Sequence, residues 1–166
     1  RLMDKFNMGC RFESYLINIL QGKSEEAAAA KAEMKALMRG AVHSYLEYAI
    51  DYASAGMYDE AAQLLSFVTE DAEVTYPMVY FELGYFASKM GNKDEAVALY
   101  KKAETICPDY CFPNKIEEVL MLNDAMKLNP EGAKAPYYLG NFHYAARIYD
   151  EAVACWEKSV SIDDTY

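Results

Sequence analysis

Three pairs of adjacent acidic residues are the first candidates for chemistry in this sequence. They are Asp59-Glu60, Asp94-Glu95 and Asp150-Glu151, and each pair precedes an alanine. Paired carboxylates can act as general acid and general base, as they do in glycoside hydrolysis. Neighbouring residues on a helix, however, point about 100° apart. Each pair also opens a stretch of helical periodicity, where the helix dipole favours negative charge. We therefore interpret the pairs as helix starts rather than as catalytic residues.

Cysteine and histidine are the next residue types that could do chemistry, as ligands of a metal ion. Cys107 and Cys111 are spaced as C-x3-C across Pro108. Zinc needs four ligands, and the two histidines, His43 and His143, are far away in the sequence. We expect His143 to be a core residue and the cysteines to be single thiols. The sequence therefore predicts no metal site and no cofactor.

Composition and charge narrow the classes of partner. The 166 residues are 53% hydrophobic and 25% charged, which is typical of a folded chain with a buried core. The net charge of −10 argues against nucleic acid or an anionic membrane as the main partner. Four cysteines are few, which favours the cytoplasm but does not establish a compartment. The chain opens on RLMDKF and closes on SIDDTY, so we expect it to be a segment of a longer protein.

The acidic pairs belong to a longer repeated pattern. The interval from Gly56 to Gly91 is 91 − 56 = 35, and the interval from Ala61 to Ala96 is the same. Ala152 follows Ala96 at a longer interval, 152 − 96 = 56, which equals one repeat of 34 plus an interruption of 22. Apolar residues recur at helical spacing almost throughout, without the alternation of strands. Periods of this length are typical of helical repeat arrays.

The residues at these positions resemble the tetratricopeptide repeat (TPR), a helix-turn-helix of about 34 residues. The best copy is PMVYFELGYFASKMGNKDEAVALYKKAETICPDY, residues 77–110, which matches the family at Tyr80, Leu83, Gly84, Gly91, Ala96, Tyr100, Ala103 and Pro108. Residues 42–76 match at Tyr45, Ala49, Tyr52, Gly56, Ala61 and Leu65. Residues 133–166 match at Leu139, Gly140, Ala152 and Trp156, with Arg147 in place of the glycine between the helices.

The resemblance implies an all-α, right-handed solenoid over residues 1–166, with one inserted helix. The units are 42–76, 77–110 and 133–166, preceded by a degenerate copy at 8–41 and interrupted at 111–132. First helices are expected at 42–55, 77–90 and 134–146, second helices at 59–70, 93–106 and 150–162, and further helices at 5–20, 25–38 and 115–128. Asn114 and Glu117 read as a capping box for the inserted helix. A single unpaired helix should change the stacking direction.

The small residues of the pattern predict how the helices pack. Gly84, Gly140 and Ala49 are expected to face Ala96, Ala152 and Ala61 of their second helices. Leu65, Tyr100 and Trp156 are expected to fill the space between neighbouring pairs. Gly56 and Gly91 are expected to supply the left-handed turn that ends a first helix.

A narrower resemblance concerns the second half of the chain. The stretches DYCFPNKIEEVL, KAPYYLGNFHY and EAVACWEKS are similar to the TPR region of large bacterial proteins that carry a sugar-mutarotase-like β-domain. This resemblance implies that the chain is part of such a protein and that its parent has a sugar-related role.

In the TPR family, certain positions of each first helix line a concave groove. Carried onto this sequence, those positions give the candidate binding residues His43, Glu47, Ile50, Phe81, Glu82, Tyr85, Lys134, Tyr137, Tyr138, Asn141 and Tyr144. The same mapping adds Leu46, Met78 and Lys89. The Lys/Asn set that grips a C-terminal carboxylate in some TPR proteins is not spread over three helices here, since Lys134 and Asn141 share one helix. The aromatic residues either form a groove for peptide, protein or sugar, or pack against the inserted helix and other domains.

Two functions from different classes follow. The first is a non-catalytic scaffold that binds a protein, a peptide or other domains of its parent chain. The alternative is part of a carbohydrate-active protein, with Glu47 and Glu82 on neighbouring first helices at a separation compatible with an inverting glycosidase. The last unit is also expected to leave Val153, Val160 and Ile162 uncovered and thereby to favour self-association.

Overall fold

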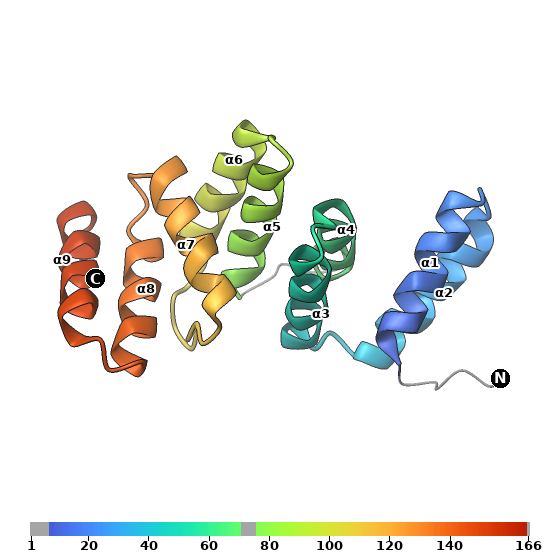
Figure 1. Cartoon of the computed structure of the whole chain (residues 1–166), viewed down its shortest axis with the longest axis horizontal. Coiled ribbons are helices and arrows are strands. Elements are labelled where there is room, and N and C mark those ends of the chain that lie inside the picture. The colour runs from blue at the N-terminus through green and yellow to red at the C-terminus, as the bar shows by residue number, and fades with distance from the viewer. Residues whose placement is uncertain (1–6, 71–75, 166) are drawn as a thin grey trace.

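The computed structural model describes residues 7–70 and 76–165, and all described secondary structure is α-helical. The helices are α1 (Met8–Leu20), α2 (Ser24–Met38), α3 (Val42–Ser54), α4 (Tyr58–Thr69), α5 (Met78–Lys89), α6 (Lys93–Glu104), α7 (Ile116–Leu128), α8 (Lys134–Ala145) and α9 (Tyr149–Ile162). They stand side by side in one extended row (Figure 1). The expected all-α solenoid is therefore confirmed. The first residues of the helix expected at 5–20 lie outside the described residues.

Four antiparallel pairs build the row, namely α1 with α2, α3 with α4, α5 with α6, and α8 with α9. Gly56 and Gly91 end the turns inside two of these pairs with φ of +83° and +88°, as predicted from the sequence. Arg147 takes the same position between α8 and α9 and adopts φ of +63°. A side chain in this region costs roughly 1–2 kcal/mol, so the turn geometry is kept here at the expense of some strain.

Two glycines on first helices make room for large rings. A Cβ atom on Gly84 would lie 2.4 Å from the ring of Tyr100, and one on Gly140 would lie 2.4 Å from the indole of Trp156. Tyr100 and Trp156 therefore pack inside their own helix pairs, which corrects the expectation that they only fill the space between pairs. The small residues of the second helices are fully buried, as predicted: Ala61, Ala96 and Ala152.

The buried apolar side chains form two clusters. The first cluster is built from α1 to α5 and the second from α5 to α8. Helix α7 contributes to both, since Met121 belongs to the first cluster and the adjacent Leu122 to the second. The inserted helix is therefore an integral part of the packed array.

Helix α7 starts one residue later than the sequence indicates, and a different carboxylate caps it. The side chain of Glu118 accepts hydrogen bonds from the backbone N–H groups of Asn114 and Lys115, both at 2.7 Å. The helix begins at Ile116, which places Glu118 rather than Glu117 at the third helical position. The predicted capping box of Asn114 with Glu117 is therefore wrong.

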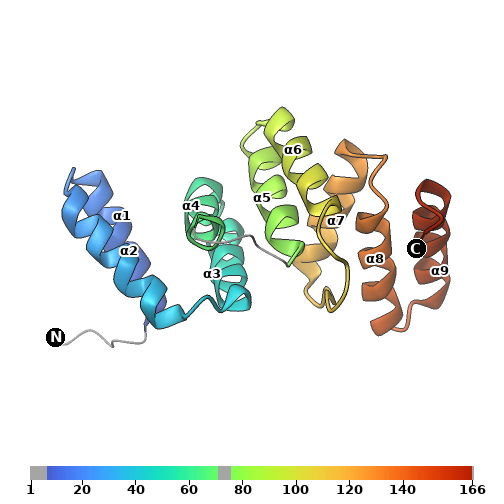
Figure 2. The same cartoon turned by 180° about the vertical axis from the view of Figure 1, so that it is seen from behind.

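The single helix α7 reverses the direction of the helices after it. Helices α3, α5 and α7 begin on one side of the row, whereas α8 begins on the other side (Figures 1 and 2). Helix α7 packs against α5 on one flank and α8 on the other. It takes the place along the row that the first helix of a following repeat would take, and α8 then runs antiparallel to α5. The sequence led us to expect a change of stacking direction, whereas the structure shows a reversal of helix polarity within one continuous row (Figure 1).

Candidate interaction surfaces

The structure divides the expected groove residues into buried and accessible ones. Fully or almost fully buried are Ile50, Phe81, Glu82, Lys134 and Tyr138. Exposed or half-buried are His43, Glu47, Tyr85, Tyr137, Asn141 and Tyr144. Helix α7 packs on both α5 and α8. Phe81, Glu82, Lys134 and Tyr138 are thus interior residues, which corrects their assignment to an open surface.

A groove does exist between α3 and α7, and we call it the α3–α7 groove. It contains two pockets that follow each other along both helices. The polar pocket, of about 290 Å³, is lined by His43, Leu46, Glu47, Tyr76, Asn114, Lys115 and Glu118. The apolar pocket, of about 170 Å³, is lined by Ile50, Ala53, Ser54, Tyr58, Tyr85, Glu117, Leu120 and Met121. The groove thus brings together four of the predicted residues, namely His43, Glu47, Ile50 and Tyr85.

Two acidic residues, Glu47 and Glu118, line the polar pocket. Lys115 Nζ lies 3.4 Å from Glu47 Oε1 and so bridges α7 to α3. Within the described residues, neither carboxyl oxygen of the fully buried Glu82 has a hydrogen-bond partner. Burial raises the pKa of Glu82 well above its ordinary value of 4.5, the carboxylate of Glu118 raises it further, and the ammonium of Lys115 opposes the shift. These effects favour the protonated form of Glu82.

The four cysteines differ in how accessible their thiols are. All four are free thiols, with Cys107 exposed and Cys111 buried. Burial raises the pKa of Cys111 to about 12, which leaves very little of the reactive thiolate at neutral pH. Across residues 7–70 and 76–165, no group of three or more His, Cys, Asp or Glu side chains is arranged to bind a metal ion.

A second accessible region lies on the last helix pair, and we call it the α8–α9 surface. It surrounds a pocket of about 360 Å³ lined by Tyr137, Asn141, Trp156, Ser159 and Val160. The indole N–H of Trp156 donates to Asn141 Oδ1 at 3.1 Å, which orients both side chains. Val153 and Val160 are 49% and 46% exposed, and Tyr144, Ile148 and Tyr149 beside them are also exposed. The predicted uncovered valines are therefore accessible, while Ile162 is half-buried.

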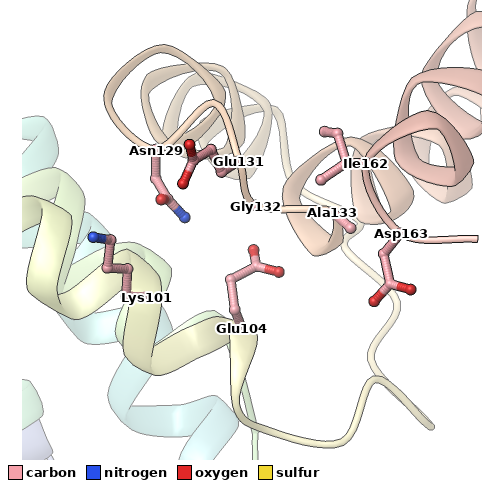
Figure 3. Close-up of a pocket in the computed structure, with 8 residues that line it drawn as sticks. All are labelled: Lys101, Glu104, Asn129, Glu131, Gly132, Ala133, Ile162 and Asp163. Carbon is pink, nitrogen blue, oxygen red and sulfur yellow. The ribbon is translucent and has the colours of Figure 1, made fainter. Parts of the chain in front are cut away.

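A further hollow, of about 400 Å³, lies where α6, α7, α8 and α9 meet (Figure 3). It is lined by Lys101, Glu104, Asn129, Glu131, Gly132, Ala133, Ile162 and Asp163. The carboxylate of Glu104 points into it, between Asn129 and Glu131 on one side and Asp163 on the other. A Cβ atom on Gly132 would lie 2.6 Å from Asn129 Nδ2 and 2.7 Å from Glu104 Oε1, so a larger residue here would displace the ends of these two side chains.

The charged groups at this hollow serve the fold. Glu104 Oε2 accepts a hydrogen bond from the backbone N–H of Lys134 at 3.0 Å, at the start of α8. The ammonium of Lys134 in turn donates to the backbone carbonyl oxygens of Glu104 and Ile106 at the end of α6. We call this contact the α6–α8 joint. Glu104 was not among the predicted site residues. The sequence around it contains no signal that its carboxylate contacts Lys134, 30 residues later in the chain.

No described helix combines the length and the apolar character that a bilayer crossing requires.

Comparison with known families adds a match to one segment of the chain. The family model of the tetratricopeptide repeat matches residues 79–110. The chain contains a tetratricopeptide repeat. This repeat comprises most of α5, all of α6 and the turn between them, and it includes Gly84, Gly91 and Tyr100, whose geometry is described above. Its first helix supplies Tyr85 to the α3–α7 groove.

Solved structures resemble the chain over most of its length. A mutant of MamA is 19% identical, with 95% of this chain and 98% of that chain covered and a TM-score of 0.46. YrrB, a TPR protein with an unusual peptide-binding site, is 17% identical, with coverages of 93% and 85% and a TM-score of 0.38. PilF of Pseudomonas aeruginosa is 15% identical, with coverages of 96% and 62% and a TM-score of 0.40.

Proposed function

We propose that this chain is a non-catalytic protein-interaction scaffold and that its α3–α7 groove holds a peptide segment of a partner. The observation that carries the proposal is the succession of two pockets between α3 and α7, which contain four residues expected on a binding face. Helical repeat arrays use such extended surfaces to bind other chains, and the tetratricopeptide repeat at residues 79–110 borders the groove.

We also propose that residues 1–166 act as one array, with units at 42–76, 77–110 and 133–166, a degenerate unit at 8–41 and the inserted helix within 111–132. Support comes from the two apolar clusters, which share helices α5 and α7.

The dimensions of the groove suit a peptide better than a folded domain. His43 and Ile50 are about 10 Å apart along the axis of α3, at a rise of 1.5 Å per residue. This distance corresponds to about three residues of an extended chain. Each pocket has room for one or two side chains. Leu120 is 56% exposed at the apolar pocket, and Tyr58 and Tyr85 add rings with polar tips, a surface that binds peptides at small entropic cost.

The carbohydrate-active alternative requires Glu47 and Glu82 to face one open site. Glu82 is fully buried, whereas Glu47 is exposed and pairs with Lys115. Because no observation places the two carboxylates around a common substrate position, we do not propose catalysis. The relation to a sugar-mutarotase-bearing parent protein remains a prediction from the sequence.

Selection from a phage-displayed peptide library against the whole chain tests the proposal. Selected peptides would then be measured by fluorescence anisotropy against the wild type, Leu120→Asp and Leu20→Asp. Leu20 is 86% exposed at the end of α1 and lies outside the groove, so it is the matched control. We expect Leu120→Asp to weaken binding at least tenfold, about 1.4 kcal/mol, and Leu20→Asp to leave it unchanged. Failure to select any peptide, or equal effects of the two variants, would overturn the proposal.

A further inference from the structure

The residues around the polar pocket carry more negative than positive groups. Glu47 comes from α3, Glu118 from α7, and Lys115 is the one lysine or arginine among the lining residues. Two acidic side chains thus line the pocket, in a chain whose net charge is −10.

The backbone of Lys115 is fixed, but another cation can replace its ammonium beside Glu47. Its backbone N–H is fixed by the carboxylate of Glu118 at 2.7 Å, so the residue stays in place when its side chain moves. Its side chain forms an ion pair across the groove, with Glu47 Oε1 at 3.4 Å, and the Glu47 side chain is 69% exposed. An exposed ion pair of this kind contributes little to stability, so a competing cation can displace it at small cost.

The apolar pocket sets a second requirement on the same partner. It lies one to two helical turns further along α3 and α7, where Ile50, Leu120 and Met121 line it together with one carboxylate, that of Glu117. A peptide that fills both pockets therefore needs an apolar side chain about three residues from the group in the polar pocket. Charge complementarity decides what that group is, because an acidic group would face Glu47 and Glu118.

We propose that the polar pocket receives a lysine or arginine side chain of the partner peptide, and that Lys115 pairs with Glu47 in its place when no partner is bound. This inference rests on the proposed function of the α3–α7 groove. The partner is thus a protein segment with a basic residue and, about three residues away, a large apolar residue. Lys115 acts as an internal competitor that lowers the affinity of the free protein for such segments.

Three synthetic peptides test the inference by fluorescence anisotropy with the whole chain at low salt. They share an apolar Leu-Tyr pair and differ about three residues away, where they carry lysine, serine or glutamate. We expect the lysine peptide to bind most tightly and its advantage to shrink at high salt. Glu47→Gln should weaken the lysine peptide roughly threefold to tenfold and leave the serine peptide unchanged. Lys115→Met should tighten the lysine peptide by a similar factor.

Matched controls separate local from general charge effects. Lys93→Met, at an exposed position of α6, removes the same charge as Lys115→Met, and Glu26→Gln, exposed on α2, matches Glu47→Gln. Circular dichroism would show that each variant is folded, and the exposed Glu47 position provides a readout even if Lys115→Met loosens the start of α7. Equal affinity for the lysine and serine peptides, or no gain with Lys115→Met beyond that with Lys93→Met, would overturn the inference.

The proposed function and this inference fail in different ways. If the serine and lysine peptides bind equally and Leu120→Asp abolishes both, the groove binds peptides but the cationic preference is wrong. If none of the three binds and library selection also yields nothing, the groove itself is not the binding site.

Discussion

Glu104 and Lys134 each hold the end of the other's helix. The carboxylate of Glu104 lies at the first backbone N–H groups of α8, and the ammonium of Lys134 lies 2.5 Å from the backbone carbonyl oxygen of Glu104 at the end of α6. Both charges have the sign that the respective helix dipole favours. Burial raises the pKa of Glu104 and lowers the pKa of Lys134, and each partner's opposite charge opposes that shift.

The first prediction concerns this α6–α8 joint. Lys134→Met removes the ammonium and leaves the Glu104 carboxylate and two carbonyl oxygens without it. We expect the free energy of unfolding to fall by about 1–3 kcal/mol, the cost of unsatisfied buried groups. Lys101→Met is the control, because Lys101 is exposed on α6 and borders the same hollow. Urea denaturation measures both variants, and equal stability would show that the joint contributes nothing.

The second prediction concerns pH and Glu82. The pKa of Glu82 is raised in the folded state above its ordinary value of 4.5, so the folded protein holds this proton more tightly than the unfolded chain. Stability from this residue is therefore full below about pH 4.5 and declines as the pH rises toward the folded-state pKa. Glu82→Gln cannot ionise, so this decline should disappear.

Urea denaturation between about pH 4 and pH 8 checks this sign. The variant should match the wild type at the acidic end and exceed it in stability at the alkaline end. Glu26→Gln, at an exposed position of α2, is the control. A constant difference between Glu82→Gln and wild type at every pH would contradict the prediction.

The third prediction concerns the close contact of Gly84 with Tyr100. Gly84→Ala would place a methyl group 2.4 Å from the ring. The ring is fully buried, and its hydroxyl donates to Asp124 Oδ2 at 2.7 Å, so it has little freedom to move. We expect a loss of about 1–3 kcal/mol from overpacking.

Gly9→Ala is the matched control for that contact. Gly9 also lies within a helix, and a Cβ atom there would meet its nearest neighbour at 3.6 Å. Alanine is the better helix former by roughly 0.5–1 kcal/mol, so Gly9→Ala should be neutral or stabilising. Thermal and urea denaturation compare the two variants. If both glycine replacements change stability alike, the packing of Tyr100 against Gly84 is not tight.

The fourth prediction concerns association through the α8–α9 surface. We expect the chain to self-associate as its concentration rises, because the half-exposed Val153 and Val160 lie beside exposed tyrosines. Val160→Asp should shift the equilibrium toward the monomer, whereas Ile19→Asp, at a similarly exposed position of α1, should not. Sedimentation velocity measures the distribution. A wild-type protein that stays monomeric at high concentration would refute the prediction.

The sequence predicts the helices well because their starts, turns and small residues are local signals. The repeat pattern predicts the positive φ angles of Gly56 and Gly91. Arg147 stands at the corresponding position of its repeat and also adopts a positive φ. The candidate site is less predictable, because burial depends on what packs against each helix. Glu82 occupies a groove position by its resemblance to the tetratricopeptide repeat but is covered once α7 packs on α5. Likewise, Glu104 meets Lys134 only because the inserted helix delivers the start of α8 to the end of α6.

Neighbouring side chains of α7 belong to two different apolar clusters, and this division affects how the protein unfolds. In a regular repeat array each unit contacts only its neighbours. Such arrays can therefore unfold repeat by repeat, starting from an end or from a weak interface between repeats. Here Met121 and Leu122 are consecutive in the chain yet lie in different cores. Loss of α7 uncovers apolar surface on both sides at once, which couples the two halves energetically. Heat or denaturant should therefore unfold the two cores in one cooperative step.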